Sequence, residues 1–143
     1  MDNPIEKKIS NYLKLQSKNK IVFYKDYSFD FNAIDIGRLL SQAIYNLKDE
    51  TKLPMRVSDE LDKILKASIT YHCSYGSMLA ISNIGIVLEP ELKQDLNMLL
   101  TKYSNNNVIF VQWEGEIEND NLYFLSKEKG IRINIINLSH IIL

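Results

Sequence analysis

The loop that follows the first apolar run lacks the residues that a phosphate-binding loop needs. Such a loop uses glycines, so that backbone N–H groups can wrap the phosphates, and a Lys followed by Ser or Thr to reach phosphate and Mg²⁺. The segment from 24 to 32 contains no glycine, and its two carboxylates, Asp26 and Asp30, would repel an anion. We therefore expect that it does not bind a nucleoside triphosphate in the usual way. After Tyr24, the segment carries three more aromatic side chains, which would keep its backbone from approaching a phosphate: Tyr27, Phe29 and Phe31.

The end of the apolar run 78–81 carries no acid either. A hydrolytic P-loop protein places an Asp there to hold the Mg²⁺ shell, whereas this chain has Ser82 and Asn83. Glu89 and Glu91 follow, and we expect them to be charges at the N-terminus of a helix. The sequence thus predicts no catalytic, cofactor-binding or metal-binding residue.

The single cysteine and the two histidines are expected to be structural. Cys73 alone cannot form an intrachain disulfide, and one Cys with two His does not complete a structural zinc site. His72 stands beside Cys73 but lacks a third partner for nucleophilic catalysis. His140 lies in an apolar terminal run. This cysteine usage suits a reducing cytoplasm.

An acidic segment with a tryptophan is the candidate site for a protein partner. Its carboxylates recur at every second position, which places them on one side of an extended chain. They would form an acidic patch for a basic partner, or else a solvated face of a ribbon. The tryptophan could anchor a partner or pack on the core. These residues are Trp113, Glu114, Glu116, Glu118 and Asp120.

The first 25 residues form the candidate nucleic-acid contact. They hold six lysines against Asp2 and Glu6, a local excess of positive charge that could bind phosphates. The alternative is a solvated helix face. The lysines that would contact DNA are Lys7, Lys8 and Lys14.

Composition limits the classes of protein to which the chain can belong. Its 143 residues fit one domain, 1–143, and its 45% hydrophobic residues suffice for a core. A net charge of −1 argues against a surface that binds nucleic acid everywhere. We expect no membrane span and no signal peptide.

Hydrophobic periodicity predicts strands that alternate with helices. We expect helices over 4–17 and 36–47, a third helix from 58 after a short strand at 53–57, and a fourth that begins at 89–91. The other predicted strands are 21–24, 78–81 and 108–111. A hairpin turns at Asn119 and Asp120, 131–135 is a further strand, and the last strand completes the sheet.

This pattern predicts an α/β fold. We expect a mostly parallel five-stranded sheet like that of P-loop NTPases, with helices on both faces and a small β-hairpin near the C-terminus. Ligands bind past the carboxyl ends of such strands. Function is therefore expected in the loops 24–32, 82–90 and 112–116.

Residues 78–125 resemble the small P-loop protein of type 3 BREX phage-defence systems. The resemblance lies in Asn83 at the strand end, the block 90–95, Trp113, Gly115 and Tyr123. The first-loop glycines, the lysine and the strand-end Asp of that family are missing. The resemblance implies a component of an anti-phage defence complex whose nucleotide site is degenerate.

Together these observations favour a non-catalytic adaptor or regulatory subunit of a bacterial defence complex, without a cofactor. Its partners would be other protein subunits of the complex, with a homo-oligomer left open. One alternative is a small ATPase of the same system. Another is a DNA-contacting accessory that uses the lysine-rich N-terminal helix.

Overall fold

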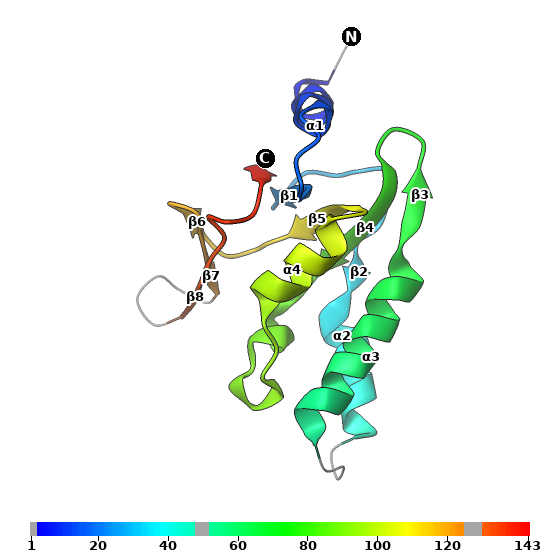
Figure 1. Ribbon diagram of the computed structural model, residues 1–143, viewed down its shortest axis with the longest axis vertical. Helices are drawn as coiled ribbons and strands as arrows, with labels where there is room; N and C mark the ends of the chain where they lie inside the picture. Colours follow the sequence, from blue (N-terminus) through cyan, green and yellow to red (C-terminus); the bar gives the residue numbers. More distant parts are fainter. Residues whose placement is uncertain (1–2, 48–51, 125–129) are drawn as a thin grey trace.

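The fold has one large mixed sheet, helices on both of its faces and a small second sheet (Figure 1). The computed structural model describes residues 3–47, 52–124 and 130–143. The helices are α1 (Pro4–Lys14), α2 (Ile36–Tyr45), α3 (Leu53–Ser68) and α4 (Leu96–Ser104), with 3-10 turns η1 (Gly85–Leu88) and η2 (Pro90–Leu92). The strands are β1 (Ile21–Tyr24), β2 (Ile34–Asp35), β3 (Thr70–His72), β4 (Gly76–Ser82), β5 (Val108–Gln112), β6 (Ile117–Glu118), β7 (Asn121–Phe124), β8 (Ile131–Asn134) and β9 (His140–Ile142).

The large sheet is mostly parallel, as the sequence predicts. Five parallel strands follow the order β2-β4-β5-β1-β9, and β3 adds an antiparallel strand beside β4. The centre of the sheet is fully buried, with Val22 beside Phe110 in the register of β1 and β5. Continuous apolar runs are typical of strands covered on both faces.

The two faces of the sheet bury alternate residues of the same strands. On one face, Ile109 and Val111 of β5 pack with α2, α3 and α4. On the other face, Val108 and Phe110 pack with α1. Successive side chains of a strand point to opposite faces, so each central strand contributes to both cores. The prediction of helices on both faces is confirmed.

The connection after β1 differs from the expected strand, loop and helix. Because β1 lies beside β5 while β2 pairs with β4, residues 25–33 must cross the sheet before the next strand begins. The two-residue strand β2 was not predicted, and α2 starts directly after it. No helix therefore begins at the carboxyl end of β1, where a phosphate-binding loop would lead into one.

The predicted strand at 53–57 is wrong, because these residues form the first turns of α3. Pro54 occupies the first turn, where a helix tolerates proline. Val57, Leu61 and Leu65 recur at intervals of four and are all buried. The buried apolar stripe of α3 thus begins within 53–57, the segment whose short apolar run predicted a strand.

The fourth predicted helix begins later than expected. The sequence predicts its start at 89–91, but the short 3-10 turn η2 occupies Pro90–Leu92, and Lys93 then adopts a left-handed backbone conformation with φ 50°. Asp95 then caps α4 by accepting a hydrogen bond from the backbone N–H of Met98. Glu89 and Glu91 are consequently not N-terminal charges of α4.

The C-terminal part forms the predicted hairpin and a second small sheet. Asn119 and Asp120 both have positive φ, as a two-residue hairpin turn of type I′ requires. The strand predicted at 131–135 corresponds to β8, which pairs with β7 rather than with the large sheet. The last strand, β9, completes the large sheet beside β1. Within residues 3–47, 52–124 and 130–143, no helix has the length and apolarity needed to cross a membrane.

Candidate functional site

A pocket of about 240 Å³ lies at the carboxyl ends of β4 and β5. This is the edge where ligands bind in parallel sheets. The chain approaches it from three sides: the turn after β4, the segment after β5 and the end of β7. It is lined by Asn83, Ile84, Gly85, Gln112, Trp113, Glu114, Gly115 and Phe124.

Trp113 is mainly a core residue, although it also lines this pocket. Its side chain is 4% exposed and belongs to the larger core, and its backbone N–H donates to the carbonyl of Tyr24. The indole Nε1 is buried and has no hydrogen-bond partner among the described residues. A partner could therefore contact Trp113 only through the pocket, so Trp113 is not an anchor on an open surface.

Two glycines allow the small sheet to pack against this edge. A Cβ on Gly115 would overlap the backbone oxygen of Tyr123, and a Cβ on Gly85 would lie 2.5 Å from the ring of Phe124. The rings of Phe124 and Trp113 lie 6.5 Å apart between centroids. The glycines thus bring an aromatic wall from β7 to the end of β5.

Glu114 supplies a carboxylate to the pocket. It is exposed, and it lines the same cavity as the amide side chains of Asn83 and Gln112. The Nε2 of Gln112 donates to the carbonyl of Lys25 at 3.3 Å, which ties the end of β5 to the end of β1. A carboxylate beside an aromatic wall can bind a planar cation, such as a guanidinium group.

The acidic residues after Glu114 do not lie on one continuous strand. The chain bends at Gly115 and turns again after Glu118. Glu116 and Glu118 flank Ile117 and are exposed. Asp120, beyond the turn, lies 3.5 Å from the Nε2 of His140. Asp120 therefore contacts the protein itself, and the exposed part of the acidic segment is shorter than the spacing suggested.

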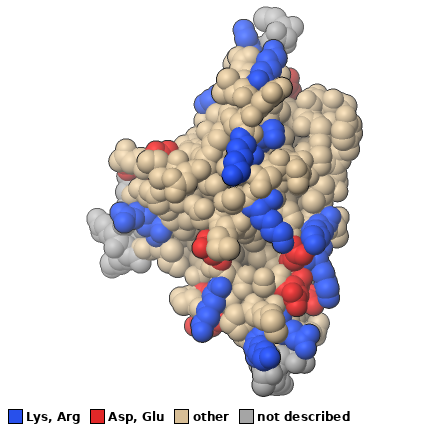
Figure 2. Space-filling model, viewed as in Figure 1, with Lys and Arg blue, Asp and Glu red and all other residues tan. Residues whose placement is uncertain are grey.

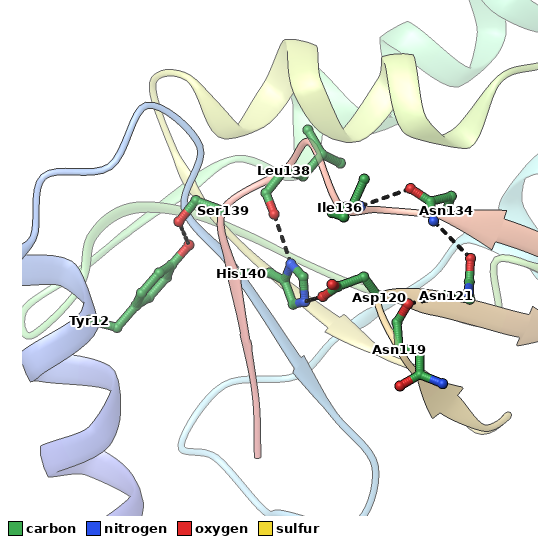
Figure 3. A network of polar contacts seen from close by, with 9 residues as sticks. All are labelled: Tyr12, Asn119, Asp120, Asn121, Asn134, Ile136, Leu138, Ser139 and His140. Carbon is green, nitrogen blue, oxygen red and sulfur yellow. Dashed lines mark hydrogen bonds and ion pairs between the residues drawn. The ribbon is translucent and has the colours of Figure 1, made fainter.

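Figure 3 shows the polar contacts around Asp120 and His140, where the small sheet meets β9. The ring of His140 also contacts the carbonyl of Leu138 through Nδ1, at 2.8 Å. The hydroxyl of Tyr12 on α1 lies 3.0 Å from Ser139 Oγ. The side chain of His140 is 11% exposed, and both of its ring nitrogens contact the protein.

Asn83 binds the carboxylate that caps α2. Its Nδ2 donates to Asp35 Oδ1 at 2.8 Å, and the backbone N–H of Arg38 donates to the same oxygen at 2.9 Å. The backbone bond from Arg38 and then the bond from Asn83 lower the pKa of Asp35 below its usual value. A helix N-terminus favours an anion, and here the protein's own carboxylate occupies that position.

The aromatic residues of the first loop cover the face of the sheet that carries α1. Phe29 and Phe31 stack with centroids 4.6 Å apart, and both contact the ring of Phe110 on β5. Tyr27 packs edge-on against Phe29 and accepts a hydrogen bond from Asn3 Nδ2 at 2.7 Å. We call Tyr27, Phe29 and Phe31 the aromatic cover.

The three lysines proposed for DNA contact have different environments. Lys8 donates to the carbonyl of Ile142 at 2.6 Å and so holds the end of β9. Lys7 and Lys14 line a groove of about 350 Å³, which also contains Glu6 and Tyr75. In Figure 2, basic side chains spread from α1 down to α3 rather than gathering on α1 alone.

The structure supplies a partner for His72 that the sequence did not reveal. The backbone N–H of Ser74 donates to Nδ1 at 3.0 Å, which leaves Nε2–H to donate to Asp30 Oδ1 at 2.9 Å. Asp30 lies 42 residues away in the sequence, so no spacing pattern could indicate the pair. Both ring nitrogens of His72 thus contact the protein, one at Asp30 and the other at Ser74, and Cys73 is exposed.

Among the residues that the structure describes, no group of three or more His, Cys, Asp or Glu is arranged to hold a metal ion. No family model matches the chain, and searches of curated proteins and of solved structures find none that is significantly similar.

Proposed function

We propose that this protein is a non-catalytic adaptor or regulatory subunit of a bacterial anti-phage defence complex, built on a degenerate P-loop scaffold. The observation that carries the proposal is the connection after β1. Its aromatic cover packs on Phe110, and the chain crosses the sheet instead of starting a helix. A segment that packs its aromatic side chains on the sheet and leads into a strand does not form the glycine-rich turn into a helix N-terminus that binds phosphates.

The order of the strands supports the scaffold part of the proposal. Numbered along the chain, the five parallel strands lie in the order 2-3-4-1-5. This order places the first strand inside the sheet between two parallel neighbours, as in doubly wound α/β folds. Such a likeness supports a scaffold and says nothing of chemistry, because function depends on the residues of the site.

The pocket at the ends of β4 and β5 supports binding of a protein partner. Its volume of about 240 Å³ suits one long side chain. Glu114 would pair with a Lys or Arg of the partner, and Phe124 would contact the alkyl or guanidinium part. Glu116 and Glu118 are exposed nearby in the sequence and would attract a basic segment.

Calorimetric titration with ATP and Mg²⁺ tests the non-catalytic part of the proposal. We expect no saturable heat at micromolar nucleotide. Clear binding in that range would favour the alternative, a small ATPase of the same system. The same titration of a Phe29→Ala variant determines whether the aromatic cover merely blocks a working site, in which case affinity would appear.

Co-purification with the products of neighbouring genes tests the adaptor part. We expect a tagged protein to retain a partner subunit, and Glu114→Arg to reduce that retention about tenfold, the size of one lost charge-assisted contact. Glu91→Arg is the matched control, because Glu91 is also an exposed acid but does not line the pocket. Equal retention by both variants would contradict this assignment of the pocket.

A further inference from the structure

The pocket that Glu114 lines contains a buried hydrogen-bond donor without an acceptor. The side chain of Trp113 is 4% exposed, and its Nε1–H has no partner among the described residues. This nitrogen lies beside Gly115, because a Cβ added to Gly115 would be 3.0 Å from it. Both residues line the pocket. A buried donor that stays unpaired costs free energy, so an acceptor on a ligand would stabilise the complex.

Two amide side chains of the lining have oxygens that no donor reaches. Asn83 Nδ2 donates to Asp35 Oδ1, and Gln112 Nε2 donates to the carbonyl of Lys25. Carboxylates and carbonyls only accept hydrogen bonds, so these two contacts fix which end of each amide is the nitrogen. Within the described part of the chain, Asn83 Oδ1 and Gln112 Oε1 accept no hydrogen bond. The lining therefore offers acceptors to a ligand that carries several N–H groups.

The charge of the lining calls for a cation. Among the described residues that line the pocket, Glu114 alone is charged. Its carboxylate is exposed and has no ion-pair partner in the described ranges. Asp35, which Asn83 contacts, is balanced by the charge of Arg38, and neither of these two residues lines the pocket. A ligand with one positive charge would therefore neutralise the site.

The aromatic wall distinguishes arginine from lysine as the source of that charge. The rings of Trp113 and Phe124 both line the pocket, with centroids 6.5 Å apart. A guanidinium group is planar, stacks on aromatic rings and carries a fork of N–H groups at its edge. An ammonium group has no face to lay on a ring and is hydrated more strongly. Arginine thus suits the carboxylate, the amide oxygens and the rings together.

We propose that this pocket binds an arginine residue of the protein partner in preference to a lysine. The guanidinium group lies between Glu114 and Phe124. Because a guanidinium has donors only, a main-chain carbonyl of the same partner segment accepts the hydrogen bond from Trp113 Nε1. The inference rests on the function proposed above, in which a basic side chain of a partner enters the pocket, and it adds which side chain that is and how its backbone is held.

Nuclear magnetic resonance of the indole group tests the proposal on the full chain. The chain has 1 tryptophan, so ¹⁵N-labelled protein gives a single indole N–H signal, which belongs to Trp113. The probes are three short peptides with blocked ends and glycine on both sides of the central residue. That residue is arginine, lysine or citrulline, which has the shape of arginine without its charge. Free arginine is the fourth probe.

The arginine peptide is expected to move the indole signal in a saturable way and to higher proton frequency, as a new hydrogen bond does. The lysine peptide should bind about tenfold more weakly, and the citrulline peptide weaker still. Glu114→Gln should weaken binding of the arginine peptide by about tenfold, the size of one lost charge-assisted contact. Glu91→Gln is the matched control and should not, because Glu91 is an exposed acid outside the lining. Unchanged backbone amide signals away from the pocket show that each variant is folded.

Three results would overturn the proposal. One is an indole signal that stays in place with excess arginine peptide. Another is equal binding of the arginine peptide and either of the other two peptides. The third is tighter binding of free arginine than of the blocked peptide, which would assign the pocket to a small molecule.

Failure of this inference can be told apart from failure of the proposed function. If the arginine and lysine peptides bind equally while Glu114→Arg still releases the partner subunit, the adaptor pocket stands and only the preference for arginine is rejected. If the partner is retained regardless of Glu114, the pocket is not the docking site, whichever peptide it binds.

Discussion

The hydroxyl of Tyr103 on α4 donates a hydrogen bond to the carboxylate of Asp62 on α3. The same bond is the main reason why the pKa of Asp62 lies well below its usual value, and Lys66 adds to the effect. Burial, followed by the bond to Asp62, raises the pKa of Tyr103 above its usual range. One contact between α3 and α4 thus contributes to a lowered pKa at Asp62 and to a raised pKa at Tyr103.

Removal of the Asp62 charge should change how stability depends on pH. The pKa of Asp62 is lower in the folded state than in the unfolded state, where it is about 3.9. The carboxylate therefore stabilises the fold at pH values above about 3.9, and this contribution is lost as the pH falls from there toward the folded-state pKa. Urea unfolding of Asp62→Asn should show a smaller loss of stability between neutral and acidic pH than the unchanged protein shows. Asp59→Asn, on an exposed residue of the same helix, is the control, and the same flattening there would refute the assignment.

Loss of the Tyr103 hydroxyl should destabilise the fold at neutral pH and raise the pKa of Asp62 toward its usual value. Tyr103→Phe leaves the ring in the core but removes the donor to Asp62, which we expect to cost about 1–2 kcal/mol at neutral pH. A double-mutant cycle with Asp62→Ala, which leaves no side-chain oxygen to accept the bond, should give a coupling of similar size. Additive effects of the two substitutions would mean that the two side chains do not interact.

Two glycine substitutions should differ in cost although both lie at the pocket. A Cβ on Gly115 meets the backbone oxygen of Tyr123, which cannot move without shifting β7. A Cβ on Gly85 meets the ring of Phe124, a half-buried side chain that can rotate. Gly115→Ala should therefore destabilise the protein by about 1–3 kcal/mol, and Gly85→Ala by less. Thermal unfolding of both variants gives the comparison, and the reverse order would contradict it.

The pattern of apolar residues correctly predicted those strands and helices whose buried side chains produce it. The apolar runs at 21–24 and 108–111 became β1 and β5, and the positive φ of Asn119 and Asp120 explains why that pair marks the hairpin. The segment 53–57 failed because a short apolar run fits a strand and the first turns of a helix equally well. Its continuation to Leu61 and Leu65 was the signal that decides between them.

The candidate site was only partly within reach of the sequence. Strand ends indicated Asn83 and Trp113, which do line one pocket. The role of Phe124 depends on how the small sheet packs, which no local pattern reports. The aromatic cover did carry a sequence signal, because its three aromatic residues alternate with polar ones. In the structure, Tyr27, Phe29 and Phe31 are half-buried, while the residues between them are exposed. That alternation is typical of an extended segment that packs one side on a sheet, whereas the residues required for phosphate binding do not indicate it.

The lysines of α1 should separate into one structural residue and two surface residues. Lys8→Ala removes the bond to the carbonyl of Ile142 and should lower the melting temperature slightly through β9. Lys7→Ala with Lys14→Ala should leave it unchanged, because both side chains lie on an exposed groove. Retention on duplex DNA that falls steeply with salt, and that only the Lys7 and Lys14 pair abolishes, would support the alternative of a DNA-contacting accessory.

The aromatic cover should hold α1 in place as well as shield the sheet. Phe31 packs on Phe29, Phe110, His72 and Tyr75, so Phe31→Ala would leave a gap in the core on the face of the sheet that carries α1. We expect a loss of about 2–4 kcal/mol, with Ser28→Ala, an exposed residue of the same loop, as the control.

Hydrogen exchange locates this effect. Because Tyr27 accepts a hydrogen bond from Asn3, the cap of α1, a displaced cover should release the start of that helix. Amides of α1 should therefore exchange faster in Phe31→Ala than in the wild-type protein. The exchange rates of α3, on the other face of the sheet, should rise only as much as the loss of global stability requires. Equal acceleration in α1 and α3 would show that the cover contributes to overall stability but does not position α1.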